Sequence, residues 1–226
     1  MRRRLHMTIL SVLVLAIGGG AAASAQAEPY FEAAVYPATI DSAPMASSIF
    51  SFGPAKWTCH GQSFSGKATE KSTALTLAPA YTECMWAYPV TTPQQPYSVV
   101  KMAMNGCDYR LHSGKRLVSE YEHLLSLECP AGQQLVIELN VGTMTICRLT
   151  VAAQTNKSRV RSTNKEIGLE MSWLVEKLKY TQDLSNPLMA CPVKPGTYED
   201  MTYSGKTRLT ATAEPGKQVP LSVTGE

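Results

Sequence analysis

The sequence lacks the residue clusters that most metal and phosphate sites need. Only four histidines occur in 226 residues. The three that follow residue 27, His60, His112 and His123, are not spaced as metal ligands on one helix or strand. No Cys-x-x-Cys pair occurs, and none of the three Ser-Gly-Lys sequences completes a phosphate loop, which needs an earlier glycine and a Ser or Thr after the lysine. We therefore expect no metal site and no cofactor.

A charge excess is also lacking once residues 1–27 are set aside. The chain has 21 Lys and Arg against 18 Asp and Glu, and residues 1–27 hold three arginines and no acid, which leaves 18 residues of each sign. A neutral chain has no electrostatic footprint for nucleic acid, so we expect no such partner. After residue 27 no segment is long and apolar enough to span a membrane.

Residues 1–27 have the pattern of an export signal. Three arginines at 2–4 are followed by a short apolar core, Thr8 to Ile17, and by the small-x-small sequence Ala25-Gln26-Ala27. The apolar core has about half the ~20 residues that a membrane-spanning helix needs. We expect cleavage after Ala27 and a secreted, extracellular domain of residues 28–226.

Short β-rich segments separated by Gly and Pro predict an all-β fold, mainly antiparallel and sandwich or barrel-like, with at most one or two short helices. Two segments are ambiguous. Residues 167–180 alternate as a strand does but also line one helical face, and we interpret them as a strand; 116–127 is a possible helix. The domain is single or has two β lobes without a clear boundary. The clearest strand candidates are 73–77, 97–104, 134–139 and 144–151.

The six cysteines carry the clearest internal pattern. Cys59 and Cys107 each begin the sequence Cys-x4-(Phe or His)-Ser-Gly-Lys, and a third Ser-Gly-Lys follows Tyr203. We interpret each copy as a strand that leads into a Ser-Gly turn.

The repeat also favours one of the 15 possible disulfide pairings. In both copies a β-rich or apolar segment and then another cysteine follow the turn, so we predict sequential pairing and a disulfide-stabilised fold. The predicted pairs are Cys59 with Cys84, Cys107 with Cys129 and, by remainder, Cys147 with Cys191.

Four short sequences resemble those of a group of uncharacterised, secreted, six-cysteine β-rich proteins of actinobacteria. They are 36–40 (YPATI), 104–109 (MNGCDY), 129–132 (CPAG) and 191–192 (CP), and the resemblance extends from about Tyr36 to Tyr203. The group has no assigned activity. The resemblance therefore implies a β-rich fold and an extracellular location, and no catalytic residue.

No catalytic motif stands out. A triad of His60 or His112 with Asp108 and a serine would require tertiary placement that the sequence does not indicate. The acidic pairs 120/122 and 199/200 would be glycosidase-like only across a cleft, and we interpret them as solvated side chains.

One segment is a candidate binding surface. Trp86 and Tyr88 follow Cys84 and precede the Pro-rich segment 91–97, so a pinned loop would present two aromatic rings to a sugar or a protein. The alternative is that Trp86 packs in the core, as we expect of Trp57 and Trp173. The solvent exposure of Trp86 distinguishes the two.

Two functional classes follow. The first, which we favour, is a non-catalytic extracellular or cell-envelope module that binds an unidentified envelope component or protein, or has a structural role. The alternative is a small secreted hydrolase whose active site the sequence does not reveal.

Overall fold

The structure is a computed structural model that describes residues 28–86, 98–185, 191–214 and 216–225. Every regular element in these residues is a strand, and the all-β prediction is confirmed. No helix of this part of the chain could span a membrane. The strands are β1 (Tyr30–Ala33), β2 (Ala38–Phe52), β3 (Ala55–Ala68), β4 (Ala74–Trp86), β5 (Ser98–Ala103), β6 (Asp108–His112), β7 (Tyr121–Glu128), β8 (Leu135–Val141), β9 (Met144–Val151), β10 (Gln154–Lys165), β11 (Gly168–Ser185), β12 (Gly196–Ala213), β13 (Lys217–Val219) and β14 (Leu221–Thr224).

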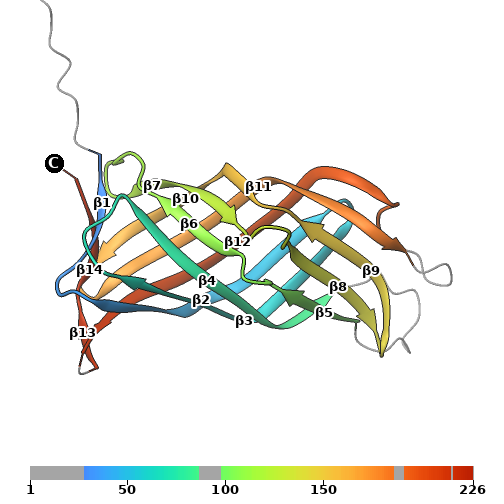
Figure 1. Cartoon of the computed structure of the whole chain (residues 1–226), viewed down its shortest axis with the longest axis horizontal. Coiled ribbons are helices and arrows are strands. Elements are labelled where there is room, and N and C mark those ends of the chain that lie inside the picture. The colour runs from blue at the N-terminus through green and yellow to red at the C-terminus, as the bar shows by residue number, and fades with distance from the viewer. Residues whose placement is uncertain (1–27, 87–97, 186–190, 215, 226) are drawn as a thin grey trace, which may run out of the picture.

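The strands form an antiparallel meander that closes on itself into a barrel-like sheet. Five long strands, β2, β3, β4, β11 and β12, extend along the molecule, and β12 pairs with β2 to close the ring (Figure 1). We call each place for one strand around the barrel a wall position. Between β4 and β11 each wall position holds two short strands that follow one another in the chain, one in each half of the barrel: β5 with β6, β7 with β8, and β9 with β10. The wall therefore has eight positions, and positions that are consecutive in the chain are neighbours in the sheet.

At the middle of the barrel, which we call the waist, one short strand of each pair ends and the other begins, and the long strands β4 and β11 have bulges there. In β4, residues 74–77 pair with β6 and residues 84–86 pair with β5. Between them lies Glu83, whose φ is 53° and where the inward face changes from odd to even residues. In β11 a shift in register with β12 separates Val175 from Leu178, with Lys177 at φ 56°. These bulges let the two halves of the wall keep separate registers.

Aromatic side chains fill the interior. An eight-stranded closed sheet is just wide enough for side chains to fill it. An apolar cavity of about 20 Å³ remains at the waist, bordered by Phe50, Tyr109 and leucines of β7. Trp57 and Trp173 both lie in this core, as expected. The rings in mutual contact include Phe50, Trp57, Phe64, Tyr81, Tyr109, Trp173 and Tyr203.

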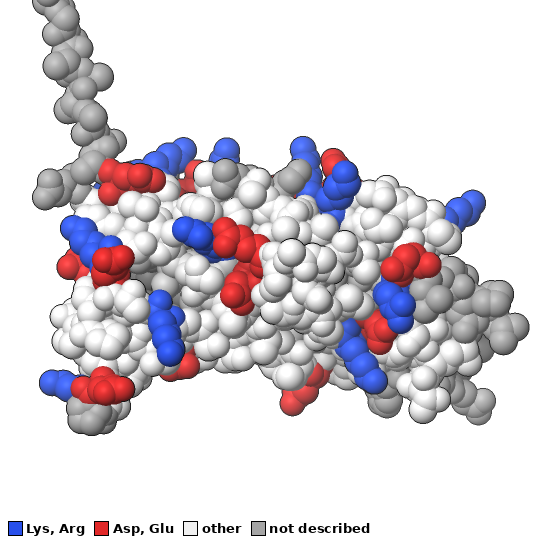
Figure 2. Space-filling view, in the orientation of Figure 1, with Lys and Arg blue, Asp and Glu red and all other residues white. Residues whose placement is uncertain are grey.

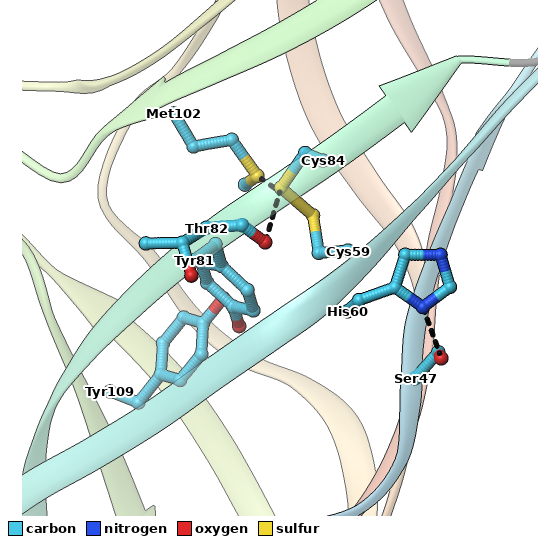
Figure 3. Close-up of a disulfide and its surroundings, with 8 residues drawn as sticks. All are labelled: Ser47, Cys59, His60, Tyr81, Thr82, Cys84, Met102 and Tyr109. Atoms are coloured by element: carbon cyan, nitrogen blue, oxygen red, sulfur yellow. Dashed lines mark hydrogen bonds between the residues drawn. A yellow bond between two sulfur atoms is a disulfide. The ribbon is translucent and has the colours of Figure 1, made fainter.

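Three disulfides join successive cysteines, the pairing that the repeat predicts. Cys59 and Cys84 are directly opposite on β3 and β4, with their Cα atoms 3.8 Å apart. Figure 3 shows this bond beside Met102, whose Sδ lies 4.0 Å from Cys59 Sγ. The Cys107–Cys129 bond continues the β6–β7 ladder by one position, and Cys147–Cys191 ties β9 to the segment before β12.

The three Ser-Gly-Lys sequences are not the turns that we expected. Residues 65–67 lie inside β3 and 204–206 inside β12, whereas 113–115 follow β6. Two of the glycines, Gly66 and Gly114, are needed for close approach of backbones rather than for a positive φ, whereas Gly205 lies beside polar side chains. A Cβ on Gly66 would lie 2.5 Å from the carbonyl oxygen of Thr76, and one on Gly114 would overlap that of Glu122.

The two chain ends build a lid over one end of the barrel. β1 pairs with β14 in a separate two-stranded sheet, which lies at one end of the molecule (Figure 1). The inward side chains of this lid, Phe31, Ala33, Leu221 and Val223, are buried. They extend the apolar core to that end of the wall.

Candidate functional site

Each of the three described histidines is hydrogen-bonded to a serine, and the pairs differ in exposure. The first is on the outer surface, the second is partly buried and the third is fully buried. The pairs are His60 Nδ1 with Ser47 Oγ (3.2 Å), His112 Nε2 with Ser126 Oγ (3.3 Å) and His123 Nε2 with Ser162 Oγ (2.7 Å).

Asp108 does not complete a triad with either candidate histidine. It is on the same strand as His112, four residues away, which places the two about 13 Å apart. It lies opposite Glu128 in the β6–β7 register, and partial burial together with that carboxylate raises the pKa of Asp108. Within the described residues, His, carboxylate and Ser do not converge as a nucleophilic site requires.

The acidic pairs belong to outer ion pairs. Glu120 lies 3.5 Å from Arg161, and Glu122 bridges Lys115 and Arg159 at 3.6 and 3.8 Å. Of the second pair, Glu199 lies 4.0 Å from Lys179, and Asp200 accepts a hydrogen bond from the backbone of Gly53. No group of three metal-ligating side chains assembles among the described residues.

A buried polar cluster lies within the aromatic core. Gln62 Nε2 donates to Tyr203 Oη at 3.0 Å, and Tyr81 Oη donates to Tyr109 Oη at 3.1 Å. Burial raises the pKa of Tyr109 to about 12 and raises those of Tyr81 and Tyr203 as well, with neighbouring tyrosines adding to the effect at Tyr81. The three phenols therefore stay neutral near pH 7 and serve as internal hydrogen-bonding groups.

The aromatic residues that the sequence singled out are only partly described. Trp86 is 6% exposed and belongs to the core, so a ligand would reach its ring only if its surroundings moved. Tyr88 lies outside the described residues, and its role stays a prediction. The neighbouring Met85 points the other way and is 44% exposed.

Met85 belongs to an uncharged outward row that the sequence did not reveal. Strand registers place six outward positions side by side across β11, β12, β2, β3, β4 and β5. Leucine, methionine and valine in this row are 54%, 44% and 44% exposed. We call these positions the uncharged row: Leu174, Ser204, Ile49, Thr58, Met85 and Val99.

Charges surround the uncharged row without entering it. The ion pairs of the described residues all belong to the β6–β12 part of the chain, and none involves β2 to β5. Lys56, Glu83 and Lys101 are exposed on β3, β4 and β5 near the row. On the face seen in Figure 2, charges of both signs are scattered and no large field of one sign forms. An apolar centre with a polar rim is the usual composition of a protein interface.

Comparison with known proteins adds no identity to this geometry. No family model, no curated protein and no solved structure matches the chain. The fold and site define a disulfide-stabilised, all-β, barrel-like protein with a filled interior.

Proposed function

We propose that the protein is exported, loses residues 1–27 and acts outside the cell as a non-catalytic module that binds an envelope component or another protein through the uncharged row. Membership of the actinobacterial six-cysteine group is part of this proposal. Three disulfides are compatible with an oxidising extracellular environment.

The single observation that supports binding at the outer wall is the exposure of Met85 and Val99, which lie opposite each other on the neighbouring strands β4 and β5. Large apolar side chains that lie side by side on the outside of a domain favour an interaction surface. The apolar cavity at the waist offers no internal site, because its volume of about 20 Å³ has room for little more than one water molecule, and this favours a site on the outer surface. Since the row is uncharged, we expect binding to change little with salt concentration.

A double variant, Met85→Asp with Val99→Asp, tests the proposal. The two side chains are opposite each other and exposed, so the fold should survive while binding to an isolated envelope fraction falls at least tenfold. The matched control is Val118→Asp, a fully exposed position before β7, which should bind as the wild type does. Undiminished binding by the double variant would remove the row from the proposal.

Export is tested separately. A non-reducing peptide map of secreted material should show Glu28 as the first residue and the three sequential bridges. A mature chain that retains residues 1–27 would contradict the assignment of the signal.

A second candidate function, a small secreted hydrolase, rests on the exposed Ser47–His60 pair. Figure 3 shows this pair on the opposite side of β3 from the disulfide. The ring atom that faces the serine is Nδ1, and the orienting carboxylate of a triad has no counterpart among its described hydrogen bonds. Hydrolysis of activated esters that is lost in Ser47→Ala would favour this candidate over binding.

A further inference from the structure

His123 is sealed inside the barrel beneath the lid. Its exposed fraction is 0%, its Nε2 lies 2.7 Å from Ser162 Oγ, and its ring centroid lies 5.0 Å from that of Phe31 in β1. Nδ1 makes no hydrogen bond, and an interaction with the backbone of His112 offsets only part of the effect of burial on the pKa of His123. Burial therefore lowers the pKa of His123 to about 4, against 6.5 in a solvated chain.

No described acidic side chain faces this imidazole from the elements packed around it. The inward side chains of β1, β10 and β14 are apolar apart from Ser162 and from Gln154 at the other end of β10, and β6 contributes Leu111 and the neutral phenol of Tyr109. An imidazolium at this position would thus have no counter-ion. Tyr121, two positions before His123 on the same side of β7, is partly buried against the core. The other charged and titratable side chains described on β1, β6, β7 and β10, apart from Tyr109 and His123, take outward positions: Tyr30, Glu32, Asp108, Arg110, His112, Glu122, Glu128, Arg159, Arg161 and Lys165.

The lid is the weakest part of the enclosure. β7, which carries His123, is held by β6 on one side and β10 on the other. The lid is one β-ladder of four residue pairs, and a few hydrogen bonds join it to the barrel. Phe31 exchanges two backbone hydrogen bonds with Ser72, and the side-chain amide of Asn164 bonds both the N–H and the C=O of Val223. A separate two-stranded sheet of four pairs opens at lower free energy than a strand that is paired on both sides.

We propose that the lid is an acid-responsive device: protonation of His123 opens β1 and β14 away from the barrel end, while the eight-position wall stays closed. Water reaches the imidazolium by the path that breaks the fewest hydrogen bonds, which is through the lid. Phe31 then leaves the imidazole, and the barrel end becomes accessible at acidic pH.

The expected change in the equilibrium constant for lid opening follows from the protonation of His123 in the closed and open states. A histidine of pKa 6.5 in the open lid and about 4 in the closed lid makes the opening constant rise as pH falls through this window. From pH 7 to pH 5 the increase is about 20-fold, by the same linkage. Below the folded pKa the constant levels off, because both states are then protonated.

Hydrogen exchange of the mature protein at pH 7 and pH 5 tests the device. After correction for the intrinsic exchange rate, protection of the amides of β1 and β14 should fall about 20-fold. Global unfolding also frees His123 and gains the same factor, so lid opening is recognised by protection that is weaker in β1 and β14 than in β2, β3 and β4 at both pH values. Unchanged lid protection, or lid protection equal to that of β2, β3 and β4 at both pH values, would overturn the proposal.

Three variants identify the group that titrates. His123→Gln retains an amide that can bond Ser162 but has no titratable ring, so the pH dependence of lid protection should vanish. Asn164→Ala removes the side-chain hydrogen bonds to Val223 and should lower lid protection at both pH values. The 20-fold ratio between protection at pH 7 and at pH 5 should remain. This variant keeps the test decisive even if His123→Gln does not fold. His60→Gln, at an exposed histidine, should behave as the wild type. A pH dependence that persists in His123→Gln would assign the effect to another group.

Discussion

The disulfide between Cys147 and Cys191 offers the sharpest test of how this fold is stabilised. It closes a loop of 44 residues, whereas Cys107–Cys129 closes one of 22. The three loops follow one another along the chain without overlap, so removing one bridge leaves the other loop lengths unchanged. We consider the variants in which both cysteines of one bridge become alanine.

The chain-entropy model gives a loss of about 4 kcal/mol in the free energy of unfolding for the 147–191 bridge and about 3.4 kcal/mol for the 107–129 bridge. The two pairs have matched burial, since Cys147 and Cys107 are buried and their partners are partly buried. The cost of truncating the side chains therefore nearly cancels in the comparison. The remaining difference, about 0.6 kcal/mol, comes from the doubled loop length.

Urea unfolding of the mature chain measures both quantities. With a slope of about 2 kcal/mol per molar urea, the 147–191 variant should unfold at a midpoint about 2 M lower than the wild type. A loss of less than about 1 kcal/mol, or a clearly larger loss for the 107–129 variant, would refute the loop-closure argument.

Three further substitutions test local features. Gln154→Ala removes a side-chain amide that bonds both the N–H and the C=O of Lys179 beside the β11 bulge, and thermal unfolding should show a loss of about 1–2 kcal/mol. Gly114→Ala would force a Cβ into a carbonyl of β7, so urea unfolding should show a loss well above the ~1 kcal/mol of the control Gly132→Ala, which has open space but a positive φ. Trp173→Phe leaves a buried threonine hydroxyl unpaired and a space in the core, and its loss of about 2–3 kcal/mol should appear in chemical denaturation. A loss below 0.5 kcal/mol in any of the three would contradict the feature it tests.

Strands were predicted best from the sequence where the inward-facing positions alternate along the strand without interruption by a bulge. The alternation of 144–151 coincides with β9, because no bulge interrupts the inward positions of its second half. Residues 167–180 were ambiguous for a physical reason. The bulge at Lys177 shifts the inward positions from Val175 to Leu178, and this three-residue step imitates one turn of a helix.

The segment 116–127, a possible helix, was ambiguous for another reason. It contains the start of β7, in which Leu124 faces outward and Leu125 faces inward. Apolar residues on both faces hide the period of two on which strand assignment depends. Its neighbour across the sheet, β10, supplies the ladder that decides the conformation.

The candidate site depends on the register between strands, which cannot be read from any one segment of the sequence. Ile49 and Thr58 become neighbours only after the bulge in β2 sets the register with β3, and the same holds for each further member of the uncharged row. Gly66 and Gly114 were assigned to turns because a sequence does not distinguish a glycine required by close approach of two backbones from one required by a positive φ.

Closure of the sheet also limits how a partner can bind. In the described residues each of the eight wall positions pairs with a strand on either side along part of its length, so no whole strand is left as an edge to which an extended peptide could add. Recognition through the wall must then use side chains on its outer face. On β2 to β5 those side chains are uncharged at the centre and charged at the margin, whereas on β6 to β12 acids and bases already neutralise each other in pairs. The part of the wall without ion pairs carries the exposed apolar pair Met85 and Val99, and a partner bound there would gain from burial without first breaking an ion pair.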